Sequence, residues 1–209
     1  MKLVLLGPPG AGKGTLAKPL SAEYNIPDVS SGDLFRNEIA GGSTLGRQLK
    51  EIMEKGDLVP DDITVQIVKK RIAADDARGG FLLDGFPRTK EQAEALARIV
   101  TLDRVLNLVI GAQEIISRLS GRKLCPVCGA IYHVEFMPPK IENQCDKGHG
   151  ELITRDDDKI DAIKNRLAVY KRQTEPLINF YSSKGLLCDI DASPSPEEVV
   201  RQAKEALEM

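Results

Sequence analysis

The most constraining feature of the sequence is a glycine-rich segment that directly follows a short apolar run. Leu3–Leu6 is typical of a buried strand, and residues 7–15 then read Gly-Pro-Pro-Gly-Ala-Gly-Lys-Gly-Thr. Glycines let backbone N–H groups point into a loop, and a helix that begins there adds partial positive charge. Lys13 would then reach the outer phosphates of a bound nucleotide. The segment therefore predicts a strand, a phosphate-binding loop and a helix, rather than an ordinary glycine-rich turn.

Further apolar runs alternate with longer amphipathic segments along the chain. Near-continuous Leu, Val and Ile content suits strands that are buried on both faces, and alternation with helices favours a parallel sheet. The predicted fold class is therefore α/β, with a parallel sheet flanked by helices. The expected strands are Lys2–Leu6, Pro27–Ser30, Phe81–Asp84, Arg104–Ile110 and Leu186–Ile190.

Two predicted helices have clear N-terminal signals, and a third is expected to contain a proline in its interior. Asp61–Asp62 follow a proline and open an amphipathic segment, as expected for the first turn of a helix. Ser195–Glu198 forms a capping box with a proline at the first helical position. Pro19 falls inside the helix expected after the glycine-rich loop. There it should remove a hydrogen bond and kink that helix.

Composition excludes several classes of protein. The 209 residues carry 29 Lys and Arg against 31 Asp and Glu, a formal net charge of −2, with no Trp, five Phe and four Tyr. No basic field or set of stacking aromatics favours nucleic-acid binding. No run approaches the roughly 20 apolar residues of a membrane-spanning helix, and four cysteines make no disulfide framework. We expect a cytoplasmic protein of one domain with insertions, which contacts neither membrane nor nucleic acid.

The residues around Lys13 also narrow the chemistry. Gly14 follows Lys13, where many phosphate-binding loops carry the Ser or Thr that ligates Mg²⁺. We therefore expect Mg²⁺ to be held through water, with Asp84 at the end of an apolar strand as the acidic residue. Gly85 follows Asp84 in place of a glutamate that could activate water, which disfavours an ATP-hydrolysing motor. No Asn-Lys-x-Asp motif supports a GTPase.

A cluster of potential metal ligands lies in an irregular stretch of the chain. Three of the four cysteines and both histidines fall within 25 residues: Cys125, Cys128, His133, Cys145 and His149. The Cys-x-x-Cys spacing is typical of a zinc knuckle. We expect a structural Zn²⁺ bound by three cysteines and His149, with His133 as the alternative fourth ligand. The remaining possibilities are a zinc ion completed by another group and a metal-free segment. Four protein ligands would leave no open position for a substrate.

Four motifs, taken together and in this order, resemble those of the adenylate kinases. They occur at compatible spacings and cover essentially the whole chain, and their combination is far more specific than any one of them. They are Gly7–Thr15; Ser30–Arg36; Asp84–Arg88 with Gln92; and Arg155–Asp158 with Arg166.

The resemblance implies a nucleoside-monophosphate-kinase-like core with two mobile insertions. The core would comprise residues 1–29, 60–121 and 159–209, the AMP-binding region residues 30–59, and the lid segment residues 122–158. The cysteine-bearing lid segment is similar to the long zinc-type lid of many bacterial members. The implied reaction is the reversible transfer of the terminal phosphoryl group of MgATP to AMP, giving two ADP, by a monomer.

The resemblance also assigns residues to each nucleotide. Phosphoryl transfer needs positioning and charge neutralisation, and guanidinium groups supply both. The catalytic side chains would be Lys13, Arg88, Arg122, Arg155 and Arg166. ATP would contact Gly10, Ala11, Gly12, Lys13, Gly14, Thr15, Arg122, Ile131, Tyr132 and the backbone of Pro194. AMP would contact Ser31, Arg36, Asp57, Leu58, Val59, Gly85, Phe86, Pro87, Arg88, Gln92, Arg155 and Arg166.

Some of these residues also have a structural interpretation. Thr89–Gln92 reads as a capping box, so only the resemblance points Gln92 toward adenine. Arg166 lies among other basic residues of a helical segment, where solvated surface charge is the ordinary explanation. Asp156–Asp158 could be only the acidic start of the helix that follows.

Two other functions would each fit part of the sequence. A UMP/CMP-type nucleoside monophosphate kinase would share the core, but Gln92 and the long lid segment disfavour it. A zinc-ribbon nucleic-acid-binding ATPase would share the cysteine cluster, but the acidic net charge and the few aromatic residues disfavour it.

Overall fold

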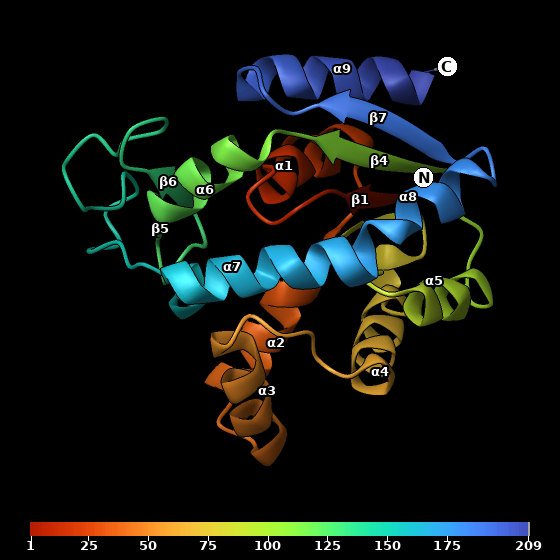
Figure 1. Cartoon of the computed structure of the whole chain (residues 1–209), viewed down its shortest axis with the longest axis horizontal. Coiled ribbons are helices and arrows are strands. Elements are labelled where there is room, and N and C mark those ends of the chain that lie inside the picture. The colour runs from red at the N-terminus through yellow and green to blue at the C-terminus, as the bar shows by residue number, and fades with distance from the viewer. Residues whose placement is uncertain (209) are drawn as a thin grey trace.

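A five-stranded parallel sheet forms the centre of the protein, as seen in a computed structural model that describes residues 1–208 (Figure 1). Its order is β2-β3-β1-β4-β7, and every neighbouring pair is parallel. The α/β prediction is confirmed, and each predicted strand is present to within one residue at either end. The strands are β1 (Lys2–Leu6), β2 (Asp28–Ser30), β3 (Phe81–Asp84), β4 (Arg104–Val109) and β7 (Leu187–Asp191).

Helices cover both faces of this sheet. Their bounds are α1 (Lys13–Tyr24), α2 (Ser31–Ala40), α3 (Thr44–Glu54), α4 (Asp61–Ile72), α5 (Lys90–Ala97), α6 (Ala112–Ser120), α7 (Ile160–Val169), α8 (Pro176–Ser182) and α9 (Pro196–Glu208). Short 3₁₀ turns lie at η1 (Asp75–Ala77) and η2 (Asp156–Asp158), and a π-helical turn, η3 (Tyr170–Thr174), lies between α7 and α8.

The alternating direction of the side chains along β1 explains why helices cover both faces of the sheet. Leu3 and Leu5 pack into a buried cluster with residues of α1 and α9, whereas Val4 and Leu6 pack into a second cluster with residues of α4, α5 and α8. Successive side chains of a strand point to opposite faces, so an unbroken apolar run requires cover on both sides. The apolar runs that predict the strands therefore also predict the helical layers on both faces.

The predicted helix starts are confirmed. α4 begins at Asp61, and α9 begins at Pro196 with the Glu198 N–H donating to the Ser195 hydroxyl at 3.4 Å. α1 continues through Pro19 to Tyr24, so the proline does not end that helix.

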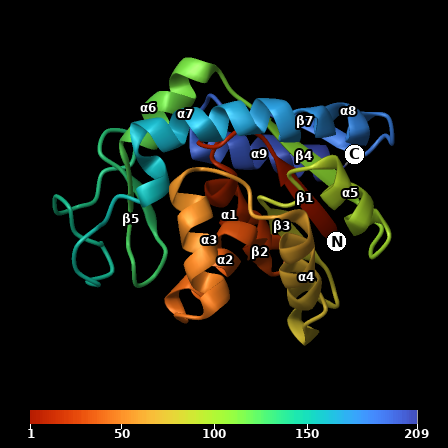
Figure 2. The same ribbon diagram turned by 60° about the horizontal axis from the view of Figure 1, so that its bottom comes forward.

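Two parts of the chain project from this body (Figures 1 and 2). α2 and α3 pack on each other around a small cluster of Phe35, Leu49 and Val59. The lid segment carries an antiparallel pair of short strands, β5 (Arg122–Leu124) and β6 (Ile131–His133), and otherwise follows an irregular path. Among residues 1–208, none of the helices combines the length and the apolar character that crossing a membrane requires.

Candidate active site

A cavity of about 950 Å³ opens at the carboxyl ends of β1 and β3, which is where open α/β sheets bind ligands. The glycine-rich loop, α2, α7 and the lid segment all contribute to its wall. Nearly all of the residues that the sequence analysis assigned to the two nucleotides line it. The exceptions are Ser31 and Phe86: the Phe86 side chain packs in the core, and the Ser31 hydroxyl donates to the carbonyl oxygen of Gly85 at 2.7 Å.

The glycine-rich loop is tightly packed against the sheet and α6. Gly7 and Gly10 have φ angles of 134° and 85°, and a Cβ at Gly7 would lie 2.8 Å from the carbonyl oxygen of Leu108. Both the backbone conformation and the space therefore require glycine. α1 begins at Lys13, whose ammonium donates to the carbonyl oxygens of Gly7 and Pro8 at 2.7 and 2.9 Å. Two carbonyl oxygens of the loop thus hold the Lys13 ammonium in place.

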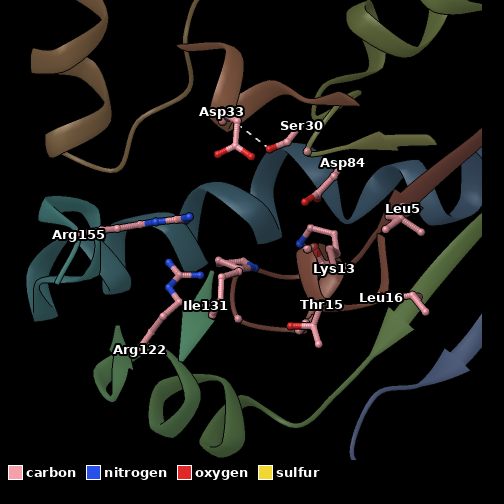
Figure 3. Close-up of a pocket in the computed structure, with 18 of the residues that line it drawn as sticks. Leu5, Lys13, Thr15, Leu16, Ser30, Asp33, Asp84, Arg122, Ile131 and Arg155 are labelled. Carbon is pink, nitrogen blue, oxygen red and sulfur yellow. Dashed lines mark hydrogen bonds between the residues drawn. The ribbon is translucent and has the colours of Figure 1, made fainter. Parts of the chain in front are cut away.

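Lys13 and Asp84 form the polar centre of the cavity. The Asp84 carboxylate is directed toward the Lys13 side chain (Figure 3). Burial lowers the pKa of Lys13 to about 8, although Asp84 opposes this effect. Burial likewise raises the pKa of Asp84, opposed by Lys13 and Arg88. A Cβ at Gly14 would contact the Asp84 carboxylate at 3.6 Å, so this carboxylate lies beside the position where other loops carry a Ser or Thr.

Six arginines line the same cavity. Arg118 pairs with Glu114, and the other five come from separate elements: Arg36, Arg88, Arg122, Arg155 and Arg166. Figure 3 shows Arg122 and Arg155 reaching from the lid segment toward the loop that carries Lys13. Burial lowers the pKa of Arg88 and that of Arg166, and it lowers the pKa of Arg155 to about 10, with neighbouring cations adding to the effect. The buried Nε of Arg155 finds no acceptor within residues 1–208. Cationic charge is thus in excess here, which favours a polyanionic ligand.

Two aspartates offset part of that charge. Asp158, whose side chain is fully buried, accepts from Arg122 Nε at 2.7 Å and from Arg166 at 3.0 Å. Asp157 pairs with Arg166 at 3.0 Å. By sequence alone this acidic run could be only the start of a helix, whereas the structure places two of its members on predicted catalytic arginines. Their place in the Arg155–Asp158 motif was the available signal.

A second group of polar residues surrounds the turn after β3. The Gly85 carbonyl oxygen accepts from both Ser31 Oγ and Arg88 Nε at 2.7 Å. Gly85 has a φ of 74°, and a Cβ there would lie 2.8 Å from the Arg88 guanidinium. Gln92, which is 1% exposed, accepts the backbone N–H of Arg88 at 2.8 Å. These hydrogen bonds therefore hold the Arg88 guanidinium and the buried Gln92 amide at the edge of the cavity.

Comparison with known proteins decides the family. The adenylate kinase family model matches residues 5–186. An adenylate kinase of Methanocella arvoryzae is 51% identical over 99% of this chain and 98% of its own length. An adenylate kinase of Treponema denticola is 50% identical over 98% of this chain and 98% of its own length. One of Archaeoglobus fulgidus is 47% identical over 100% of this chain and 98% of its own length. The chain belongs to the adenylate kinase family. Its reaction is the transfer of a phosphoryl group between ATP and AMP, as the motifs predicted.

This adenylate kinase also has a cluster that could bind zinc. The ligand atoms of Cys125, Cys128, Cys145 and His149 all lie within 4.8 Å of one another. His149 Nδ1 is 3.7 Å from the Cys145 sulfur and 3.9 Å from the Cys125 sulfur. Three sulfurs and one imidazole nitrogen are a ligand set that a structural zinc site uses. The donor set therefore fits the ion.

Both ring nitrogens of His133 form hydrogen bonds outside the cysteine cluster. Its Nε2 donates to the carbonyl oxygen of Ser117 at 3.1 Å, and its Nδ1 accepts the backbone N–H groups of Glu135 and Phe136, both at 3.0 Å. With both nitrogens bonded, no lone pair is left for a metal. Of the two histidines, His149 joins the cysteines, as the sequence analysis preferred.

Tyr132 connects the cluster of cysteines and His149 to the cavity. It lines the cavity, and its hydroxyl donates to the Cys145 sulfur at 3.6 Å. Burial alone would raise the pKa of Cys145, but hydrogen bonds from the Lys147 backbone and from Tyr132 help to lower it to about 6. The thiolate, which is the form that ligates metals, is thereby favoured.

Proposed function

We propose that this adenylate kinase binds its two nucleotides on opposite sides of the cavity, with their phosphates meeting among the arginines. The observation that carries this assignment is the gathering of Lys13 and six arginines around one cavity, only partly offset by acidic residues. Two polyphosphates would supply the balancing negative charge. Their mutual repulsion is the main obstacle to transfer, and positioned cations remove it.

The glycine-rich loop would bind ATP. Backbone N–H groups of Gly10–Thr15 and the start of α1 would surround its phosphates, and Lys13 would reach the outer ones. Arg122 would approach the phosphates from the lid segment, while Ile131, Tyr132 and the backbone at Pro194 would border the rest of the nucleotide. This grouping is supported by the cavity, which all of these residues line.

The turn after β3 and the helices beside it would bind AMP. Arg36 and Arg88 would hold its phosphate, and Gln92 would read its adenine. The backbone of 57–59 and Gly85–Pro87 would complete this side, with Ser31 supporting Gly85 through its hydroxyl. We therefore treat residues 30–59 as the AMP-binding region, residues 122–158 as a mobile lid, and the remainder as the core.

The transfer itself requires no protein nucleophile. An oxygen of the AMP phosphate forms a bond to the terminal phosphorus of ATP as the bond to the departing ADP oxygen breaks. Lys13, Arg88, Arg122, Arg155 and Arg166 would hold the charge on the oxygens throughout. Closure of the lid segment would exclude water, which would otherwise accept the phosphoryl group.

Two metal ions are proposed. Mg²⁺, when it is bound with ATP, offsets phosphate charge, and Asp84 would hold it through water, as its place beside Gly14 supports. Zn²⁺ would be held by Cys125, Cys128, Cys145 and His149 and would organise the lid segment, whose own buried cluster is limited to a few residues.

One chain would be sufficient for activity, because the residues for both nucleotides line one cavity. We therefore propose a monomer. Zinc ligation by thiolates requires reduced cysteines, which fits a cytoplasmic enzyme.

Separate binding measurements test this assignment. Calorimetric titration of ATP and of AMP should show that Lys13→Met weakens ATP binding about tenfold or more and leaves AMP binding essentially unchanged. Gln92→Leu should show the opposite pattern. Lys70→Met, at an exposed lysine of α4, is the matched control and should change neither. A Lys13→Met defect confined to AMP would reject the assignment of the two sides.

A further inference from the structure

The amide of Gln92 is fixed at both of its ends. Its Oε1 accepts the backbone N–H of Arg88 at 2.8 Å, and its Nε2 donates to Asp61 Oδ1 at 2.7 Å. Asp61 lies 31 residues earlier, at the first position of α4. A buried side-chain amide therefore has one partner that can only donate and one carboxylate that accepts.

These two partners dictate which way the amide faces. A glutamine amide is nearly symmetric in shape, and rotation by half a turn exchanges its oxygen and nitrogen. Here such a rotation would place the amide N–H groups against the Arg88 N–H and the amide oxygen against the Asp61 carboxylate. Both contacts would be repulsive in a buried position, where unpaired polar groups are costly. Gln92 is thus held in one orientation.

The remaining Asp61 oxygen strengthens this arrangement. Asp61 Oδ2 accepts from the Thr89 hydroxyl at 2.9 Å, and the same hydroxyl oxygen accepts the backbone N–H of Gln92 at 3.2 Å. Thr89 is buried, and it caps α5. Asp61 therefore holds both the end of α5 and the amide that this helix presents to the cavity.

The orientation matters because the amide retains one acceptor lone pair and one N–H for a ligand. Adenine offers a donor at its 6-amino group beside the acceptor N1, which such an amide can pair with in full. Hypoxanthine offers the reverse pattern, an acceptor at O6 beside a donor N1–H. A freely rotating amide would pair with either base, whereas a fixed one would meet hypoxanthine oxygen against oxygen and N–H against N–H.

We propose that Asp61 is a specificity-determining residue of this enzyme: by fixing the Gln92 amide, it selects adenine and rejects 6-oxopurines as the acceptor base. This inference rests on the proposed contact between Gln92 and the base of AMP. Asp61 acts only through Gln92, so it is a positioning residue. Discrimination of this kind can be large, because a mismatched base leaves buried polar groups unpaired.

Inosine monophosphate is the probe that isolates the effect, because it differs from AMP only in the groups at positions 1 and 6. The measurement is kcat/KM for AMP and for IMP with saturating MgATP. Asp61→Asn keeps the shape of the side chain but offers both a donor and an acceptor, so position 61 no longer opposes rotation of the Gln92 amide and only the Arg88 N–H still does. Asp61→Ala removes the partner altogether. Asp62→Asn, at the exposed neighbour in the same helical turn, is the control for loss of a negative charge.

We expect the AMP-to-IMP ratio of kcat/KM to fall about tenfold in Asp61→Asn and further in Asp61→Ala, and to be unchanged in Asp62→Asn. A merely structural role would lower kcat/KM for both acceptors in proportion, and that outcome would overturn the inference. An AMP-to-IMP ratio equal to that of the wild type, in an Asp61 variant that binds ATP normally, would also overturn the inference.

The Gln92→Leu variant distinguishes the role of Asp61 from the proposed contact between Gln92 and the base of AMP, on which that role depends. If Gln92→Leu lowers the ratio and the Asp61 variants do not, Gln92 reads the base without help from Asp61. If Gln92→Leu leaves both kcat/KM values unchanged, the contact between Gln92 and the base fails, and the role of Asp61 fails with it.

Discussion

The hydroxyl of Thr174 donates a 2.8 Å hydrogen bond to the carbonyl oxygen of Arg88, which lies 86 residues earlier in the chain. Thr174 is buried at the end of the π-helical turn that follows α7. Since Gln92 accepts the N–H of Arg88 at 2.8 Å, both polar groups of the Arg88 backbone are bonded to other elements. π-helical turns recur at functional sites, and this one joins Arg88 to the helical run that carries Arg166.

Thr174→Val should therefore impair catalysis while preserving side-chain shape. Removing the hydroxyl leaves a buried carbonyl oxygen unpaired, which costs about 1–3 kcal/mol of stability. It also frees the peptide that positions Arg88, so we expect kcat to fall roughly tenfold or more. Thermal unfolding and steady-state kinetics check both effects. Thr174→Ser keeps the hydroxyl and should retain kcat; equal losses in the two variants would contradict the role of the bond.

Arg88→Ala tests one of the cations that line the cavity shared by the two proposed nucleotide sides. The substitution removes positive charge where the phosphates would meet, and we expect kcat to fall at least ~100-fold. The circular dichroism spectrum should remain that of the wild type. Arg71→Ala, which breaks a surface pair with Asp76 at 2.6 Å, is the matched control and should retain kcat. A folded Arg88→Ala enzyme with near-normal turnover would reject the assigned role.

Lys13 should make ATP binding dependent on pH. Burial lowers its pKa to about 8 in the free protein, and a polyphosphate beside it would raise that pKa again. ATP would therefore bind with proton uptake above pH 8, and its affinity should fall as the pH rises through that value. Calorimetry in two buffers of different ionisation enthalpy measures the proton. Lys13→Met should abolish this pH dependence, and its persistence in the variant would assign the proton to another group.

The same pKa shift affects folding. An unfolded chain keeps Lys13 protonated up to about its ordinary value of 10.5, so the unfolded state binds more protons between pH 8 and pH 10.5. The Lys13 contribution to stability should consequently rise with pH across that window. The difference in unfolding free energy between wild type and Lys13→Met, followed by urea titration, should change in that direction.

Zinc removal tests the cysteine cluster. Elemental analysis should find one Zn²⁺ per chain, and its removal should lower the unfolding temperature, because site formation and local folding share one free energy. His149→Ala should reduce zinc affinity strongly. His133→Ala should barely change it, because both of its ring nitrogens are bonded to the backbone. A reversed ranking would move the fourth ligand, and a metal-free native protein purified without chelator would remove the site.

The bonds of the segment from Thr89 to Gln92 can be predicted only in part from the sequence. The capping signal is real, since the Gln92 N–H donates to Thr89 Oγ1 at 3.2 Å. The Gln92 side chain does not complete the box, however. It bonds instead to Arg88 and to Asp61, and no local pattern identifies Asp61 as a partner.

The sequence by itself determined the sheet, the loop and the helix starts, because these depend on neighbours in the chain. Apolar runs identify β1–β4 and β7, glycines mark the loop before Lys13, and capping residues mark α4 and α9. Only the tertiary structure decided which distant groups meet. It placed Asp158 on Arg122 and Arg166, set His149 rather than His133 beside the cysteines, and brought Thr174 to Arg88. Those pairings depend on the path of the folded chain, and burial makes them strong because unpaired groups there have no water to bond.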